Sequence, residues 1–297
     1  MQITNLHDLP ASLVRAVTYD DYDYAKAGDI SVTSLILPPR IRQLMKRHAA
    51  EITEDATERI WRLIGSVGHK IVERAADPNE FTEERLSATV NGWTITGKVD
   101  ILREAGGYVI EDMKFTSVWA IKDEKPDWTQ QLNLYAHLAR EHGFDIKALR
   151  IIAVLRDWSK PKAAREKEKD YPQVGVVVRE VPLWSPKEQE TFLSNRVVDH
   201  QMAEKWSDDQ LPMCTPDERW RKPDVWAVKK KGNKRAIKLF ETEHEAAEMV
   251  SLANSFDHGL IVEHRPGQDV RCLSYCNVRQ FCQYGRSLKQ GEGDESA

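Results

Sequence analysis

The chain has 297 residues and a mass of 34.1 kDa, enough for one large domain with an appended module. Hydrophobic residues make up 41% and charged residues 30% of it, which excludes collagen-like, low-complexity and wholly disordered classes. The net charge of -4 excludes a protein that is basic all over but allows a local basic patch. The aliphatic runs are far shorter than the roughly 20 residues of a membrane-spanning helix, so we expect a soluble globular protein.

The spacing of apolar residues predicts an α/β core. The first 76 residues carry apolar positions at helical spacing, which predicts two helices. A period of two then begins, and Asn91-Gly92 stands between two β-prone runs, where this dipeptide favours a tight hairpin. The predicted order after the helices is three antiparallel strands (86–90, 93–102 and 108–115), a helix beyond Pro126 and an apolar strand (149–155).

The C-terminal half is expected to add a smaller module. A strand (174–183) and a helix (187–206) precede a change of composition at 211–221, where Pro, Cys and Arg are mixed. We therefore predict a core over 1–210, a basic module that contains cysteines over 211–290, and an acidic tail over 291–297. Within the module the sequence predicts a lysine-rich turn around Gly232, a helix (243–255) and a strand (260–264).

Two carboxylates and a lysine are predicted to converge in the three-strand meander. Asp112 and Lys114 share a strand face because side chains alternate, whereas Glu111 points the other way. Asp100 ends the neighbouring strand, so antiparallel pairing can bring it beside Asp112. Two adjacent carboxylates repel unless a cation lies between them, and Mg²⁺ or Mn²⁺ prefers such oxygen ligands. The alternative is an ordinary solvated face with a surface ion pair.

Three further residues accompany this cluster along the chain. His69 lies between Gly65 and Glu73 on the preceding helix, where a neutral imidazole could complete a metal site. Two glycines so close together in a helix indicate a close backbone approach or space left for a ligand. Gln131 and Tyr135 lie four residues apart on the following helix, hence on one side of it. Taken alone, each of them is better explained by an ordinary structural role: a histidine or glutamine at a helix surface, and a tyrosine in an amphipathic core.

In order and spacing, these elements resemble the PD-(D/E)XK nuclease superfamily, and most closely its RecB-like branch of phage-type exonucleases and CRISPR-associated adaptation nucleases. The resemblance covers about 31–155 and includes Ser31-Val32-Thr33, which is similar to an N-terminal Ser-x-Thr signature of the family. It implies a restriction-endonuclease-like fold. It also implies metal ligation by His69, Asp100 and Asp112, catalysis by Asp100, Asp112 and Lys114, and support of the active site by Gln131 and Tyr135.

The four cysteines of the chain are expected to form one metal site. Cys272, Cys276 and Cys282 cluster near the C-terminus, and Cys214 is the remaining one. The first ten residues lack the layout of a secretion signal, so we expect a reducing cytoplasm, where disulfides are disfavoured. Four thiolates suit either zinc or an iron-sulfur cluster. The family resemblance favours a 4Fe-4S cluster, although the first gap here has three residues where relatives usually have two.

A basic segment lies between the first two of these cysteines. From Arg219 to Lys238 it holds nine Lys or Arg residues and a single acid, interleaved with Trp220 and Trp226. Basic side chains neutralise phosphates and aromatic rings stack on unpaired bases, so the segment is a candidate DNA contact. A hairpin tip that is merely solvated explains the lysines at 229–231 equally well.

The sequence leads to one main functional hypothesis. We expect a Mg²⁺- or Mn²⁺-dependent DNA nuclease, more specifically an exonuclease that hydrolyses phosphodiester bonds at single-stranded or duplex ends in recombination or repair, in a bacterial or phage-infected cell. No sequence element that reads base edges is evident, which disfavours a restriction enzyme. The alternatives are a catalytically silent DNA-binding or assembly subunit with the same fold, and a nuclease that acts on RNA.

Overall fold

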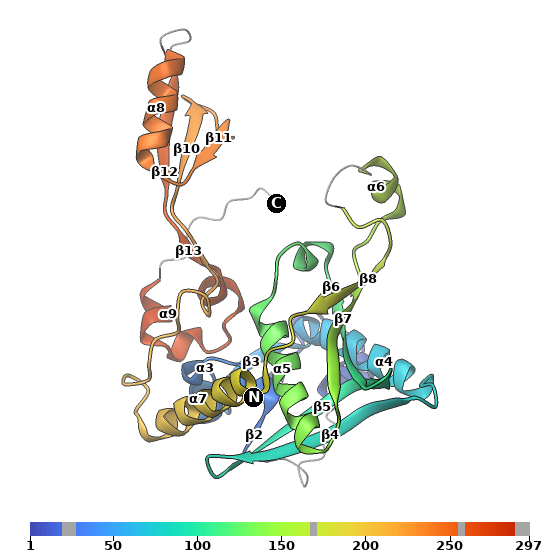
Figure 1. Cartoon of the computed structure of the whole chain (residues 1–297). Helices are drawn as coiled ribbons and strands as arrows, with labels where there is room; N and C mark the ends of the chain where they lie inside the picture. Colours follow the sequence, from blue (N-terminus) through green and yellow to red (C-terminus); the bar gives the residue numbers. More distant parts are fainter. Residues whose placement is uncertain (20–27, 167–170, 255–258, 289–297) are drawn as a thin grey trace. The chain divides into compact units, whose positions relative to one another are not determined.

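The structure is a computed structural model that describes residues 1–19, 28–166, 171–254 and 259–288 (Figure 1). It divides into two compact units, the first formed by 1–42 and 49–205, the second by 43–48 and the chain from 206 onward. The acidic tail predicted at 291–297 and Ser255, the last residue of a predicted helix, lie outside the described residues. Within the described ranges, no helix has both the length and the apolar character that crossing a bilayer requires.

The first unit is a mixed α/β structure. Its strands are β1 (Gln2–Thr4), β2 (Ile30–Ser31), β3 (Thr53–Asp55), β4 (Glu80–Val90), β5 (Trp93–Glu104), β6 (Tyr108–Thr116), β7 (Ile146–Leu155) and β8 (Val176–Val181). Its helices are α1 (Ala11–Thr18), α2 (Val32–Leu35), η2 (Ala56–Arg59), α4 (Ile60–Arg74), η3 (Val118–Ile121), α5 (Pro126–Glu141), α6 (Lys160–Arg165) and α7 (Pro186–Lys205). The residues of α3 (Pro39–Arg47) are divided between the two units.

The main sheet has the order β2-β5-β6-β7-β8, and β4 pairs with β5 as well. β4, β5 and β6 follow one another in antiparallel pairing, whereas β7 is parallel to β6. The β4–β5 hairpin turns at Asn91 and Gly92, whose φ angles of 48° and 78° suit these two residue types and match the right-handed twist of the strands. The first 76 residues contain more than the two helices predicted, because α1 and α2 are too short to show a clear periodicity.

The core lies where α5 crosses one face of the sheet (Figure 1). α5 contacts β4 to β7 on one side and α7 on the other, so almost its whole circumference is buried. Fully buried Asn133 donates to the carbonyl oxygens of Thr129 and Pro182 and accepts from the Trp184 N–H, which satisfies its polar atoms inside this layer. The residues that α5 presents to the sheet are therefore held in fixed positions.

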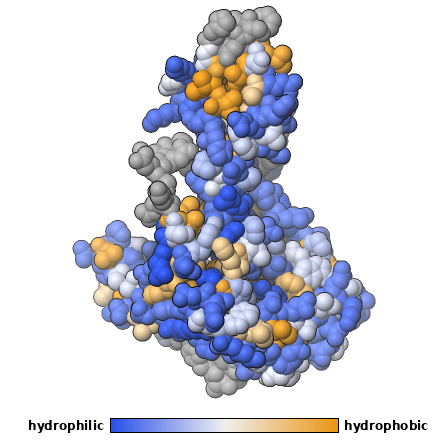
Figure 2. Space-filling model, turned by 90° about the vertical axis from the view of Figure 1, so that its left-hand side faces the viewer, coloured by the Kyte–Doolittle hydropathy of each residue, from blue (hydrophilic) through white to orange (hydrophobic). Residues whose placement is uncertain are grey.

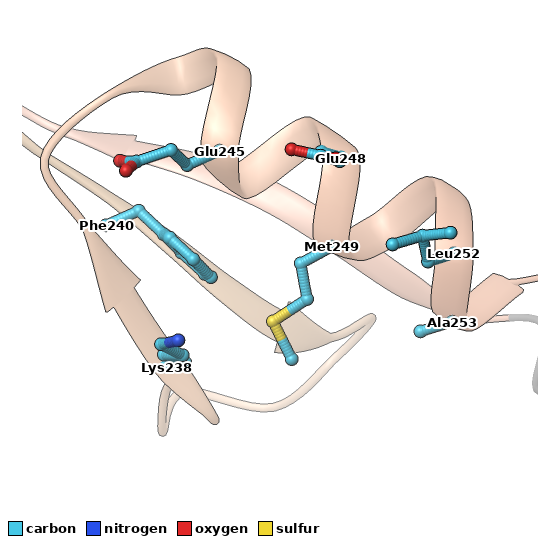
Figure 3. Close-up of a pocket in the computed structure, with 7 residues that line it drawn as sticks. All are labelled: Lys238, Phe240, Glu245, Glu248, Met249, Leu252 and Ala253. Carbon is cyan, nitrogen blue, oxygen red and sulfur yellow. The ribbon is translucent and has the colours of Figure 1, made fainter.

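The second unit contains a small sheet with one covering helix. Its elements are β9 (Arg221–Lys222), β10 (Val225–Lys230), β11 (Lys238–Phe240), α8 (Glu243–Asn254), β12 (Leu260–Arg265), β13 (Gln268–Asp269), η4 (Arg271–Tyr275), η5 (Arg279–Phe281) and α9 (Gln283–Ser287). β10 is the central strand between β11 and β12, and α8 connects these two outer strands. Figure 2 shows apolar residues gathered on this module. Figure 3 shows a hollow between β11 and α8, where Phe240, Met249 and Leu252 lie around it.

Candidate active site

The candidate site lies where strands β5 and β6 part. Their pairing runs from Glu104 and Tyr108 to Ile101 and Glu111 and stops there. Nearer its start, at Ile95 and Thr96, β5 pairs with the short strand β2 in place of β6. Asp100 and Asp112 are the first residues beyond the last pair, so they flank the fork. Both carboxylates line a cleft of about 910 Å³ to which α2, α4, β4 and α5 also contribute side chains.

A chain of polar contacts joins Asp112 to α5. Asp112 is 2% exposed, and its Oδ2 lies 2.6 Å from Nζ of Lys114. Lys114 also donates to Oε1 of Gln131 at 3.1 Å, while Nε2 of Gln131 donates to Asp112 Oδ1 at 3.2 Å and to the Tyr135 hydroxyl at 3.0 Å. Gln131 thus holds the lysine and the carboxylate at once. These four predicted site residues meet because strand and helix periodicity bring each pair to one side of its element.

Strand alternation separates the two acids that precede Met113. Glu111 forms an ion pair with Arg103 on β5 and lies 3.4 Å from Arg150 on β7, away from the cleft. Asp112 points into the cleft instead. Of the two acids, Asp112 is therefore the one positioned beside Asp100.

Asp100 lies beside a histidine and a second acid. Its Oδ2 accepts a hydrogen bond from the Met113 N–H at 2.8 Å and lies 3.4 Å from Nδ1 of His69 on α4. The same Nδ1 lies 3.7 Å from Oε1 of Glu83 on β4. One ligand atom each from His69, Glu83 and Asp100 falls within 4.8 Å of the others. This nitrogen and oxygen set suits a divalent cation.

The sequence analysis missed Glu83. At this residue β4 departs from regular strand geometry, with a φ of 55°, and the pairing with β5 skips from Thr82 to Glu84. The register is the same on both sides of this gap, so Glu83 lies opposite Asp100 and on the strand face that also presents Arg85 to the cleft. A non-glycine residue with this φ is strained. Glu83 also forms an ion pair with Lys98, which lies on β5 beside the cleft. The strain at Glu83 is consistent with a role in the site.

The electrostatics of the cleft suit a bound cation. Burial and the nearby Asp112 carboxylate raise the pKa of Asp100 to about 8. Burial lowers the pKa of His69, which favours the neutral imidazole that binds metals. Oδ2 of Asp112 is buried and, among the described residues, accepts no hydrogen bond of good geometry. A divalent cation in the cleft would favour the ionised form of Asp100 and could be bound by this oxygen of Asp112.

Comparisons with known proteins decide the family. The family model described as PD-(D/E)XK nuclease superfamily matches residues 35–283, most of the chain. The chain belongs to the PD-(D/E)XK nuclease superfamily. Members are generally nucleases that typically use Mg²⁺ or Mn²⁺, so membership indicates nuclease activity.

Two other comparisons, with solved structures and with curated proteins, do not extend this family assignment. The crystal structure of SSO0001 resembles this PD-(D/E)XK chain with a TM-score of 0.41 at 14% identity, covering 63% of this chain and 81% of the other. No curated protein matches the sequence.

The packing of helix α4 in this PD-(D/E)XK chain explains why one of its two glycines has no side chain. A Cβ on Gly68 would lie 2.0 Å from the ring of Phe115, which follows Lys114 on β6 and contacts His69 edge-on. A Cβ on Gly65 would meet nothing within 4 Å. The predicted close approach therefore occurs at Gly68 and not at Gly65.

This difference gives a prediction for two matched variants. Gly65→Ala should raise the free energy of unfolding by up to about 1 kcal/mol, because alanine favours the helix and has free space. Gly68→Ala should lower it by about 1–3 kcal/mol, because Phe115 must move aside. Urea denaturation of both variants measures the effect. Equal shifts for the two would show that contact with Phe115 does not limit this position.

The cysteines of the PD-(D/E)XK chain all lie in the second unit. Cys214 precedes β9, Cys272 lies in η4, Cys276 follows it, and Cys282 immediately precedes α9 as its N-cap. Burial raises the pKa of Cys214 to about 12 and that of Cys272 to about 11, and the neighbouring cysteines add to both shifts. The four thiols are therefore near one another. Among the described residues, no three sulfurs lie within 4.8 Å of one another.

The basic segment between Cys214 and Cys272 is only partly solvated. Lys229 is largely buried in an ion pair with Glu263, which also bonds to Arg265 at 2.9 Å. Trp226 is half-buried against His264, whereas Trp220 is 44% exposed. Lys229 and Trp226 thus serve the packing of the small sheet. The DNA contact predicted for the whole segment stays a prediction.

Proposed function

We propose that the chain is a Mg²⁺- or Mn²⁺-dependent deoxyribonuclease of the RecB-like branch that degrades DNA from its ends. The single observation that carries this proposal is the meeting of Asp100, Asp112 and Lys114 at the fork between β5 and β6, beside the His69 and Glu83 ligand atoms. Family membership makes the substrate a phosphodiester. Degradation from ends in recombination or repair rests on the resemblance to RecB-like exonucleases.

The residues present fit a divalent cation. His69, Glu83 and Asp100 would hold it, and Asp112 would approach from the other side of the fork. When bound, the ion supplies a Lewis acid for the phosphate oxygen and lowers the pKa of a water molecule.

The chain itself positions the reacting groups. Lys114, held by Gln131 and Asp112, presents its ammonium to the cleft, where it can orient the attacking water and offset the charge that develops on the phosphate. The Tyr135 hydroxyl accepts a hydrogen bond from Nε2 of Gln131 and so fixes the orientation of the amide whose Oε1 holds Lys114. Gln131 and Tyr135 are therefore positioning residues. Burial and the nearby carboxylates raise the pKa of Tyr135, so it stays protonated and acts as a hydrogen-bonding group.

The experiment that tests the function is digestion of linear DNA. We expect end-labelled single-stranded or duplex DNA to be shortened in the presence of Mn²⁺ or Mg²⁺ and to stay intact in EDTA. Circular DNA of the same sequence separates attack at ends from internal cleavage. Wild-type protein that degrades neither form of DNA with either ion would contradict the proposal.

We further propose that Cys214, Cys272, Cys276 and Cys282 hold a 4Fe-4S cluster. Four thiolates would also bind one zinc ion, so the choice of an iron-sulfur cluster rests on the resemblance to RecB-like nucleases. Its role would be to stabilise the C-terminal segment, because the ligands lie in η4, just before α9 and in two connecting segments.

The colour of the purified protein tests the proposal of an iron-sulfur cluster. We expect protein purified without oxygen to be brown and to absorb broadly near about 400 nm. Cys276→Ser should remove most of this absorbance and lower the melting temperature, whereas conversion of exposed Ser251 to alanine should change neither. A colourless protein with one zinc per chain would contradict the cluster and leave the nuclease proposal intact.

A further inference from the structure

Two exposed tryptophans of the first unit lie on helices next to the site, one on η3 after β6 and one near the start of α4. Trp119 is 62% exposed on η3, five residues after Lys114. Trp61 is 53% exposed near the start of α4, eight residues before His69. Eight helical residues span about 12 Å, which is the distance along α4 from Trp61 to His69, and Trp119 follows Lys114 within five residues; neither ring lines the cleft itself.

Cationic side chains lie over both indole rings. Nζ of Lys122 lies 4.4 Å and Nζ of Lys162 5.6 Å from the centroid of the Trp119 ring, and the guanidinium of Arg156 lies 4.1 Å from that of Trp61. These distances are those of cation–π contacts. We call these five residues, Trp61, Trp119, Lys122, Arg156 and Lys162, the rim cluster.

Backbone contacts tie the rim cluster to the catalytic strand. The Arg156 N–H donates to the Thr116 carbonyl at 2.9 Å, and the Val118 N–H donates to Oδ1 of Asp157 at 2.7 Å. The end of β7 is thereby joined to the segment that leads from Lys114 to Trp119. Asp157 is the single acid in the segment from Arg156 to Arg165, which holds four basic residues, so this segment is positively charged.

The exposure of the two rings is not explained by packing. Trp158, in the same segment as Arg156, is half-buried against the core and donates its indole N–H to the Pro172 carbonyl at 2.9 Å. Trp119 and Trp61 instead keep more than half of their surface in water although cations lie over them. Large apolar rings exposed beside basic groups are typical of surfaces that bind single-stranded nucleic acid.

We propose that the rim cluster binds single-stranded DNA, with bases stacked on Trp119 and Trp61 and phosphates neutralised by Lys122, Arg156 and Lys162. This inference rests on the proposed nuclease function and adds the preferred form of its substrate. Unpaired bases expose the faces that an indole ring can cover, whereas bases in a duplex already stack on one another. The rim cluster would thus direct a single strand toward Lys114.

Binding without cleavage tests this inference. Fluorescence anisotropy in EDTA would measure the affinity for a labelled 20-nucleotide thymidine strand and for a labelled 20-base-pair duplex. We expect Trp119→Leu to weaken binding of the single strand about tenfold and binding of the duplex less than about twofold. Trp119→Phe should retain most of the affinity, because its ring still stacks. Tyr19→Leu is the control, since Tyr19 is also an exposed aromatic residue.

The outcomes separate this inference from the nuclease proposal, because no divalent ion is needed for the binding readout. Unchanged binding of the single strand by Trp119→Leu, an equal loss for single strand and duplex, or no binding by the wild type would overturn it. Each of these results leaves the digestion experiment with Mn²⁺ to decide the nuclease activity on its own. Quenching of tryptophan fluorescence by the thymidine strand, reduced in Trp119→Leu, would support stacking directly.

Discussion

Replacement of Lys114 by methionine is expected to slow DNA cleavage about a thousandfold while leaving the fold and DNA binding in place. Methionine keeps the length and the apolar stem of lysine but removes the ammonium that lies 2.6 Å from Asp112 and bonds to Gln131. A preorganised charge aimed at the developing phosphate charge typically contributes a factor of this size. Initial rates at saturating DNA and Mn²⁺ measure the effect as a loss in kcat.

Two comparisons make this result specific. Lys147→Met removes an exposed lysine that pairs with Asp145 at 2.6 Å and does not line the cleft, and should cleave as the wild type does. Circular dichroism and anisotropy with labelled DNA would show that Lys114→Met is folded and binds. Cleavage by Lys114→Met within about threefold of the wild type would remove Lys114 from the mechanism.

Replacement of Glu83 by glutamine is expected to weaken Mn²⁺ binding about 10- to 100-fold. Glutamine has almost the same shape but lacks the negative charge, and Oε1 of Glu83 is one of the three ligand atoms that fall within 4.8 Å of one another. Losses of this size are typical when a group that supports a metal site is removed. Isothermal titration of the protein with Mn²⁺ in the absence of DNA measures the change.

The next acid along the strand provides the control. Glu84 belongs to β4 as well but is not among the residues that line the cleft, so Glu84→Gln should bind Mn²⁺ normally. Lost cleavage by Glu83→Gln at low Mn²⁺ should be recovered in part at high Mn²⁺, because affinity and not chemistry is impaired. Wild-type affinity in Glu83→Gln would restrict the ligands to His69 and the aspartates.

The sequence was sufficient for the family and for several residues that the structure brings together in the cleft. The resemblance to the PD-(D/E)XK superfamily is confirmed by a match over 35–283, and the mixed α/β class agrees with the structure. Local periodicity explains this success: alternation along β6 separates Asp112 from Glu111, and helical spacing aligns Gln131 with Tyr135. The RecB-like branch, the roles of the site residues and the iron-sulfur cluster stay predictions.

Glu83 was missed although a signal for it was present. The hairpin pairs Val90 with Trp93, and the same register continued along β4 places position 83 opposite Asp100. Residue type and alternation alone do not identify this acid, because β4 contains several charged residues. Counting the register from Asn91-Gly92 would have found it. Its backbone irregularity, by contrast, has no local sequence signal that we recognise.

The fork between β5 and β6 and the rim cluster could not be predicted from the sequence, for a different reason. The fork requires the short strand β2 to pair with β5 from about 65 positions earlier in the chain. The rim cluster joins α4, η3 and the end of β7, whose side chains meet through tertiary packing. Neither arrangement follows from a local period, since each depends on contacts between segments far apart in sequence.

The central claim is that Asp100 and Asp112 share one divalent ion in the cleft. Anomalous diffraction from crystals of the protein soaked in Mn²⁺ tests it most directly. We predict a single peak about 2.0–2.3 Å from a carboxylate oxygen of each aspartate, with His69 or Glu83 completing the ligand set. The claim would be contradicted by a manganese peak that does not contact both aspartates. It would also be contradicted if protein that degrades DNA with Mn²⁺ showed no peak in the cleft.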